Sequence, residues 1–160
     1  MNLIPTPLIR HNARCKDCGY GFTVYDFSDF EYGQKLGSTP NPRELGLLDT
    51  FNDPVFEEVE ELVDEFLKPL GTEDWQRAKC FDSVFGITCD PSPSGYAYDF
   101  TGKVWCPVCG SNEISYGPDV PPQVDVINLH VITHNAWQQL SEAEKRERLR
   151  EALQKAGCLP

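Results

Sequence analysis

Two Cys-x-x-Cys pairs constrain what this 160-residue chain can fold into more than any other feature. The first pair is Cys15 and Cys18, the second is Cys106 and Cys109, and residues 19–105 separate them. A tight turn between two cysteines lets both sulfurs converge on one ion, and two such turns supply four thiolates. We therefore predict that the fold brings the two pairs together around a single metal ion.

The predicted metal is one zinc ion in a structural role. Four thiolates complete a tetrahedron and leave no coordination position for water or substrate. Glycine follows each pair, at Gly19 and Gly110, where the turn needs a backbone position without a Cβ. Metal binding of this kind contributes on the order of 10 kcal/mol to folding. No catalytic residue is assigned, because the chain holds no Gly-rich phosphate loop, paired-carboxylate motif or serine elbow.

The surroundings of the two pairs resemble rubredoxin and the wider zinc-ribbon class over residues 13–27 and 103–116. Two stretches carry the resemblance: Cys15-x-x-Cys18-Gly19-Tyr20 and Trp105-Cys106-Pro107-x-Cys109-Gly110. The resemblance implies an antiparallel ribbon around the metal. Rubredoxins hold iron and transfer electrons, but their spacer is much shorter, so zinc is favoured over iron here. Zinc ribbons serve many processes, so the resemblance implies metal binding without implying one function.

The negative charge of the chain is concentrated in one segment. The net charge is −11, and residues 44–74 hold eleven of the 25 acidic residues against one base. A body with this charge repels phosphate backbones, which disfavours nucleic acid as a partner. No stretch reaches the roughly 20 apolar residues that a membrane span needs. The seven cysteines, four of them in metal-type pairs, indicate metal binding rather than disulfides, so we expect a cytoplasmic protein.

A helix that begins at Pro54 is the clearest in the chain. Asn52 or Asp53 can cap it, apolar residues recur at helical spacing from Val55, and Gly71 ends the run. Its opposite side is acidic. We call the following residues the acidic face: Glu57, Glu61, Asp64 and Glu65. This face is a candidate surface for binding a protein partner, and the alternative is a face that is merely solvated.

Other segments show weaker patterns. Residues 1–9 are extended and proline-restrained, as an arm along the body or a frayed terminus. Strands are predicted at 20–27, 86–89 and 96–100. A second helix is predicted over 72–85. Its candidate inner positions are Trp75, Ala78, Phe81 and Phe85.

The C-terminal part begins with a stiff linker from Pro118 to Pro122. Residues 124–131 are apolar enough to form a strand or a buried extended run. Thr133 is predicted to cap a short helix. Ser141-Glu-Ala-Glu144 is a capping box, which predicts a helix over about residues 142–156.

The last helix is rich in bases: Lys145, Arg146, Arg148 and Arg150. These bases could dock against the acidic face, contact nucleic acid, or pair with glutamates of their own helix. Pairing within the helix is favoured, because glutamates flank the bases at helical spacing.

Five further residues with ligand or nucleophile chemistry receive no role. His130 and His134 are four positions apart and could hold a second metal on a helix, but the surrounding residues favour a strand-to-helix junction that would point them apart. Cys80, Cys89 and Cys158 are predicted to be ordinary buried or tail thiols.

Together these elements predict an α+β protein. A small four-cysteine zinc ribbon of antiparallel strands (residues 1–32 and 96–117) is interrupted by a mainly helical acidic insertion (33–95). A linker and two C-terminal helices follow (118–160), and we expect one compact unit.

The expected function is that of a non-enzymatic zinc-binding module that interacts with another protein. It would serve as a regulator or inhibitor of a nucleic-acid-handling machine, or as a structural component of an assembly. Two alternatives stay open: direct nucleic-acid binding through the ribbon and the basic helix, and rubredoxin-type electron transfer. No membrane association and no small-molecule substrate are expected.

Overall fold

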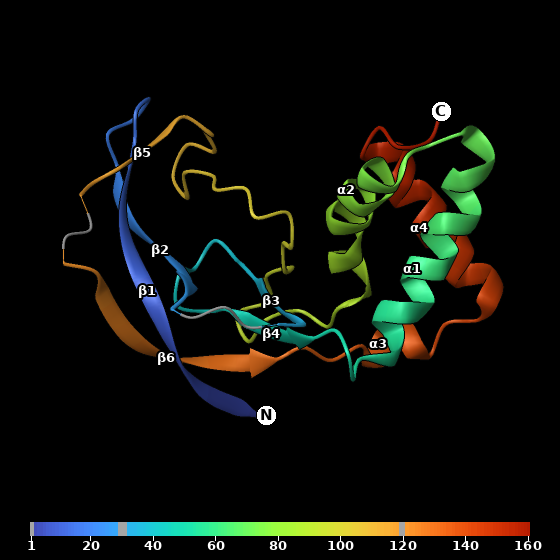
Figure 1. Ribbon diagram of the computed structural model, residues 1–160, viewed down its shortest axis with the longest axis horizontal. Helices are drawn as coiled ribbons and strands as arrows, with labels where there is room; N and C mark the ends of the chain where they lie inside the picture. The colour runs from blue at the N-terminus through green and yellow to red at the C-terminus, as the bar shows by residue number, and fades with distance from the viewer. Residues whose placement is uncertain (1, 29–31, 119–120) are drawn as a thin grey trace.

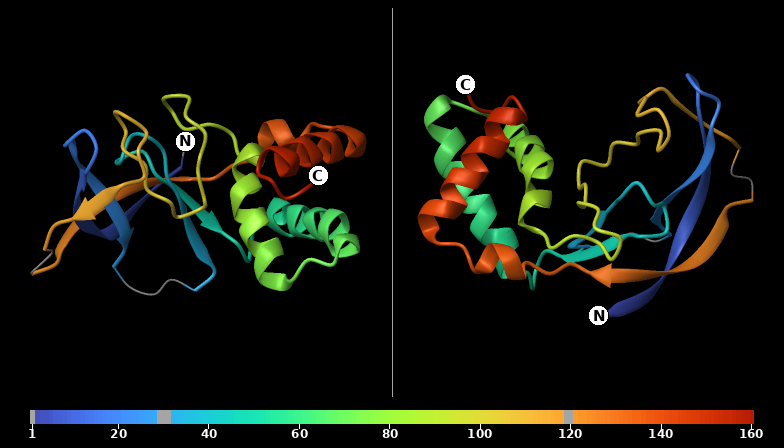
Figure 2. Two further views of the ribbon diagram at one scale, coloured as in Figure 1. Left: turned by 90° about the horizontal axis from the view of Figure 1, so that it is seen from above. Right: turned by 180° about the vertical axis from the view of Figure 1, so that it is seen from behind.

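The structure is a computed structural model that describes residues 2–28, 32–118 and 121–160. A twisted β-sheet forms one end of the molecule and a group of helices forms the other (Figure 1). The same division is seen from above and from behind (Figure 2). The mixed helix and strand content confirms the predicted combination of the two kinds of element. None of the helices described is long and apolar enough to cross a membrane.

The sheet orders its strands as β2-β1-β6-β4-β3, and β5 pairs with the far end of β1. The strands are β1 (Leu3–Cys15), β2 (Gly21–Phe27), β3 (Gln34–Gly37), β4 (Gly46–Asp49), β5 (Ile114–Tyr116) and β6 (Gln123–Val131). The pairings are antiparallel except that of β4 with β6, which is parallel.

Strand β1 pairs with three other strands of the sheet. It pairs with β6 through Leu3–Arg10, with β2 from Leu8 onward, and with β5 at its last three residues. Pro5 and Pro7 precede the part that β2 covers, so their missing N–H groups cost no hydrogen bond to that neighbour. The predicted extended arm is thus correct, and the frayed-terminus alternative is wrong.

Two predicted parts of the chain are mixed into this sheet. The insertion, expected to be mainly helical, also supplies β3 and β4. Residues 123–131 form β6, which lies between β1 and β4 at the centre of the sheet. The predicted linker at 118–122 includes residues 119–120, which lie outside the described residues. Pairing between distant strands, which no local pattern reveals, explains why the sheet is larger than a ribbon.

The α-helices of the described chain are α1 (Pro54–Leu67), α2 (Asp74–Val84), α3 (Asn135–Gln138) and α4 (Glu142–Lys155). Asp53 caps α1 by accepting hydrogen bonds from the amides of Val55 and Phe56, as predicted. The capping box of Ser141 and Glu144 opens α4. Helix α2 is also close to its predicted span, although two predicted inner residues, Trp75 (62% exposed) and Ala78, are exposed.

An apolar core fills the space between α1, α2 and α4. Its fully buried members include Val59, Leu67, Phe85, Leu149 and Leu153. A smaller core on the sheet is built around Leu8, Leu129 and neighbouring residues. Burial of a leucine or valine side chain contributes about 1.5–3 kcal/mol, so the helical end holds most of the hydrophobic stabilisation.

Two short segments differ from the predicted strands. Residues 85–88 form a 3-10 helix, η2, because Thr88 turns back to donate its hydroxyl to the Phe85 carbonyl. Residues 96–100 make only an isolated bridge, between Asp99 and Ser38. Phe85, Tyr98 and Phe100 of these segments pack in the core with the helices. Side-chain packing therefore decides their conformation, and not the hydrogen bonds of a β-sheet.

The cap of α3 comes from a different part of the chain than predicted. Thr133 donates its hydroxyl to Asp90, and the Asp90 carboxylate accepts the amides of Asn135 and Ala136. Burial acts to raise the pKa of Asp90, but these hydrogen bonds outweigh it and leave the pKa below its usual value.

Cys80 and Cys158 form a disulfide, which corrects the prediction that both are ordinary thiols. The bond joins α2 to the chain beyond α4. The odd cysteine count is accounted for by four cysteines that could hold a metal ion, one disulfide and Cys89. Because disulfides persist mainly in oxidising compartments, the cysteine count no longer supports a cytoplasmic location, which stays a prediction.

The basic helix α4 docks on the acidic helix α1. Lys145 lies 3.2 Å from Glu58 and Arg146 lies 2.6 Å from Glu65. Arg150, paired with Glu147, follows the predicted pairing within the helix. Docking wins over self-pairing because the buried apolar side of α4 faces the same core as α1.

Candidate metal centre

The two cysteine pairs meet where the end of β1 pairs with β5. Cys15 ends β1, and β5 pairs antiparallel with Ala13–Cys15 so that Ile114 faces Cys15. The amide of Lys16 also donates to the Glu113 carbonyl at 2.8 Å. We call the turn that carries each Cys-x-x-Cys pair a knuckle. Strand pairing between residues about 100 positions apart therefore places the second knuckle beside the first, as predicted.

The two knuckles have the same backbone geometry. Gly19 and Gly110 have φ of 78° and 75°, and each donates its amide to the carbonyl of the first cysteine of its pair at 2.9 Å. The amides of Cys15 and Cys106 in turn donate to the residue after that glycine, at 2.9 and 2.8 Å. A positive φ costs glycine nothing and strains other residues, which explains the glycine in both motifs.

The four sulfurs fit a tetrahedral ion. The Sγ atoms of Cys15 and Cys109 are 3.5 Å apart, as are those of Cys18 and Cys106. All four lie within 4.8 Å of one another. A tetrahedral ion with metal–sulfur bonds of about 2.3 Å requires sulfurs about 3.8 Å apart. The donor set therefore suits a closed, structural metal site.

Electrostatics at the site favour a cation. At Cys106, burial alone would raise the pKa, but the amides of Cys109 and Val108 stabilise the thiolate and lower the pKa to about 6. At Cys109 the amide of Ser111 favours the thiolate, but the neighbouring sulfurs oppose a second negative charge and raise the pKa to about 12. Four thiolates this close repel one another, and a divalent ion at their centre removes that cost.

The centre is buried on one side only. Cys15 and Cys106 are buried, whereas Cys18 and Cys109 are exposed. Asp17 accepts a hydrogen bond from the Ser111 hydroxyl, which ties the exposed rims of the two knuckles together. Within residues 2–28, 32–118 and 121–160, this is the one cluster of three or more ligand-type side chains with metal-binding geometry.

His130 and His134 belong neither to the four-cysteine cluster nor to a second metal cluster among the described residues. His130 lies on β6, whereas His134 follows the strand and precedes α3. The predicted strand-to-helix junction is confirmed. No second cluster appears in the described part of the chain.

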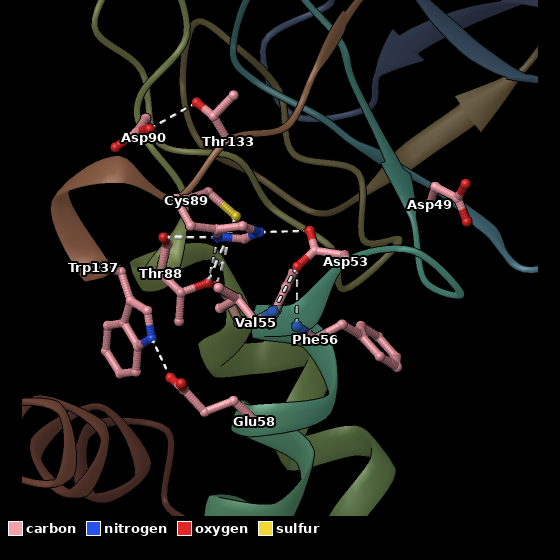
Figure 3. Close-up of polar contacts among 12 residues, drawn as sticks. Asp49, Asp53, Val55, Phe56, Glu58, Thr88, Cys89, Asp90, Thr133 and Trp137 are labelled. Atoms are coloured by element: carbon pink, nitrogen blue, oxygen red, sulfur yellow. Dashed lines mark hydrogen bonds and ion pairs between the residues drawn. The ribbon is translucent and has the colours of Figure 1, made fainter. Parts of the chain in front are cut away.

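His134 instead belongs to a buried polar cluster that the sequence did not suggest. Its Nε2 lies 2.6 Å from Asp53 Oδ2, and its Nδ1 lies 2.9 Å from the Thr88 carbonyl oxygen. Asp53 uses its other oxygen to cap α1 (Figure 3). The cluster joins the start of α1, η2 and the start of α3. The only signal in the sequence was Asp53 before Pro54, which predicted a cap and nothing more.

Burial and hydrogen bonds shift the pKa values of the acidic groups at this cluster. Cys89 lies beside it (Figure 3), and burial raises the pKa of its thiol to about 12, which leaves it protonated and a weak nucleophile. Burial also acts to raise the pKa of Asp53, but the hydrogen bonds from His134 and from the helix amides outweigh it and lower the pKa. Both ring nitrogens of His134 already face oxygens of the protein.

The acidic face divides into engaged and open members. Asp64 pairs with Arg77 and Lys68, and Glu65 pairs with Arg146. Glu57 and Glu61 are exposed on α1. Exposed ion pairs contribute only about 0–1 kcal/mol. Glu65 could therefore leave Arg146 and pair with a basic group of a partner at little cost in stability.

Comparisons with protein-family models, with curated proteins and with solved structures found no match to this chain. The likeness to zinc ribbons therefore depends on the two cysteine pairs and on their meeting in space. The geometry is compatible with a zinc-ribbon-like site, and it indicates metal binding.

Proposed function

We propose that this protein is a non-enzymatic zinc-binding module that acts by binding another protein. The observation that carries the proposal is the four-cysteine cluster, in which all sulfurs lie within 4.8 Å of one another. A closed set of four thiolates holds a metal without offering a coordination position to substrate. The metal centre then serves as a clasp that holds one end of the sheet.

Zinc is preferred to iron in this proposal. Tetrahedral sites of four thiolates accept either ion. A structural zinc site needs only closure and rigidity, and both knuckles are held by matched backbone hydrogen bonds. Electron transfer of the rubredoxin type is the alternative for the same cluster.

The acidic face of α1 is the proposed contact surface. Glu57 and Glu61 are exposed and Glu65 is held in an exposed pair, while the whole chain carries a net charge of −11. Such a field speeds association with a basic surface. A regulator or inhibitor of a nucleic-acid-handling machine would use this charge, as would a component of an assembly. Direct binding of nucleic acid through α4 is disfavoured, since Lys145 and Arg146 pair with α1.

The metal is tested by elemental analysis of protein purified without added metal. We expect one zinc per chain and no visible absorption from ferric thiolate. Cys106→Ser should lose the metal, whereas Cys89→Ser, a change outside the cluster, should keep it. One iron per chain with thiolate absorption would instead establish the electron-transfer alternative.

The contact surface is tested by affinity capture from the native cell extract. The triple change Glu57→Lys, Glu61→Lys and Glu65→Lys should abolish capture of any specific partner and leave zinc content unchanged. A partner that stays bound to this variant would overturn the role of the acidic face. Binding of DNA or RNA that falls steeply with salt would favour the nucleic-acid alternative.

A further inference from the structure

A groove runs between β2 and the irregular segment 97–105. Its volume is about 460 Å³, within the range of binding sites for small ligands and short peptides. Its lining is largely apolar and aromatic, with Phe22 on β2, Ile87 at the end of η2, and Trp105 beside the metal ligand Cys106. Ile87 and Trp105 are 46% and 47% exposed, so the apolar side chains that line the groove are accessible to solvent.

The groove follows the edge of β2 rather than one of its faces. It is lined by four consecutive residues, Phe22 to Tyr25. Successive residues of a strand point to opposite faces, so a groove that touches all four lies along the strand edge. Strand β2 is the outermost strand on this side of the sheet, with β1 as its neighbour.

The hydrogen-bond register shows which peptide groups face the groove. Cys15 donates its amide to the Tyr20 carbonyl, and this facing pair continues the register in which Ala13 faces Phe22. Facing pairs in an antiparallel ladder alternate between bonded and outward-pointing peptide groups. Phe22 and Val24 therefore bond to β1, and the N–H and C=O groups of Thr23 and Tyr25 point away from β1 on the groove side. Thr23 is half-buried, whereas Tyr25 is 8% exposed.

The same alternation is seen from the other side of β1. Asn12, which faces Thr23, directs its carbonyl away from β2 and accepts the amide of Gly117 at 2.9 Å. Within the described residues, no backbone hydrogen bond from another segment reaches Thr23 or Tyr25 on the groove side. An edge with unpaired peptide groups is a template for an added strand.

Opposite this edge the groove is closed by a second wall. Segment 97–105 stands across it, anchored by the Ser38–Asp99 bridge and by the knuckle that follows Trp105. A strand added to β2 would lie between β2 and this segment, which lines the opposite side of the groove and would meet the further strands of a second sheet. This geometry favours a peptide segment over a second copy of the protein.

We propose that the groove binds an extended segment of a partner protein as an added strand on β2. The segment pairs with the peptide groups of Thr23 and Tyr25, and places alternate apolar side chains against Phe22, Ile87 and Trp105. Asp82, Asp99 and Lys103 line the groove, and Asp82 already pairs with Lys35 at 2.8 Å. Basic residues are expected to flank the segment because the whole chain carries a net charge of −11. This proposal rests on the proposed function, since it names the kind of partner, but it uses a surface other than the acidic face.

The test uses the zinc-loaded full chain and a displayed library of random linear peptides about 12 residues long, a length that covers an added strand. Selected peptides should share alternating apolar positions flanked by lysine or arginine. Thr23→Pro removes an outward N–H but spares the ladder to β1, and should weaken binding of a selected peptide at least about tenfold. Thr23→Val keeps the amide and should bind like the natural protein.

A second pair of variants keeps the test decisive if Thr23→Pro does not fold. Ile87→Lys places a charge in the apolar wall and should also weaken binding at least about tenfold. Val126→Lys, a matched change at a residue of β6 that is 66% exposed and outside the groove, should not. Circular dichroism and zinc content verify the fold of each variant.

Several outcomes would overturn the proposal. They are a selection that yields no binder, peptides that bind Ile87→Lys unchanged, a self-associating chain whose dimer depends on Thr23, and a groove that takes only small apolar molecules. Charge reversal of the acidic face separates this proposal from the previous one. Peptide binding lost with the reversed acidic face and kept in Ile87→Lys would remove the groove and leave the acidic face in place.

Discussion

The two ends of the molecule are held by different chemistry. The helical end has a continuous apolar core and a disulfide between Cys80 and Cys158. At the knuckle end the large apolar side chains near the four cysteines, such as Tyr20, Trp105 and Val108, are exposed. Hydrophobic burial therefore stabilises one end and the four-cysteine cluster the other, so each end should respond to its own chemical challenge.

Metal removal should have the largest effect, and it should be confined to the knuckle end. Binding of a structural zinc is worth on the order of 10 kcal/mol, and few buried contacts remain there without it. In Cys106→Ser we expect hydrogen exchange of the amides of Cys15, Gly19 and Gly110, which donate to backbone carbonyls within the two cysteine turns, to become fast. The amides of α1 and α4 should stay protected. Equal loss of protection at both ends would show that the molecule is one cooperative unit.

Loss of the disulfide should have an intermediate effect at the opposite end. Removing a bond that closes a long loop costs about 2–4 kcal/mol. The double change Cys80→Ser and Cys158→Ser should lower the urea midpoint of helix unfolding and leave zinc content unchanged. Cys89→Ser is the matched control. An unchanged midpoint in the double variant would mean that the apolar core alone holds this end.

The Asp53–His134 pair, which lies between the two ends, should have the smallest effect. Asp53→Asn keeps a capping oxygen but removes the charge, and should cost about 1–3 kcal/mol at neutral pH. The folded pKa of Asp53 is lowered, so its contribution is present above the unfolded pKa of about 3.9 and is lost as pH falls through the folded value.

Urea unfolding at several pH values checks this contribution. The difference in stability between the natural protein and Asp53→Asn should shrink as the pH falls from about 5 towards 2. Asp49→Asn serves as the control, because Asp49 accepts local hydrogen bonds at an exposed turn and has no histidine partner in these contacts. A difference that is constant with pH would exclude the ion pair as its source.

Local patterns predicted the parts of the fold that are encoded locally. Helix α1 follows the cap, Pro54 and the apolar spacing, and α4 follows its capping box. The metal cluster was predictable because tight thiolate pairs need an ion whatever surrounds them. Trp75 was assigned to the core by spacing alone, yet it is exposed and donates to Glu73.

Features that depend on distant pairing could not be read from the sequence. The disulfide requires knowing that the chain after α4 returns to α2. The pairing of His134 with Asp53 requires knowing that β6 ends beside the start of α1. The groove depends on β2 being an edge strand, which the order of the strands decides. In each case the residue types permitted several partners, and the topology chose one.

The three partners of β1 set an order of events during synthesis. β1 can pair with β2 as soon as the first hairpin has been made, but its other partners, β5 and β6, begin at Ile114 and Gln123. At about 5–20 residues per second, the first two ligands, Cys15 and Cys18, therefore wait several seconds for the second pair. During that interval the edge of β1 that later pairs with β5 and β6 is unpaired. A strand of another chain could pair with this edge until β5 and β6 have been made.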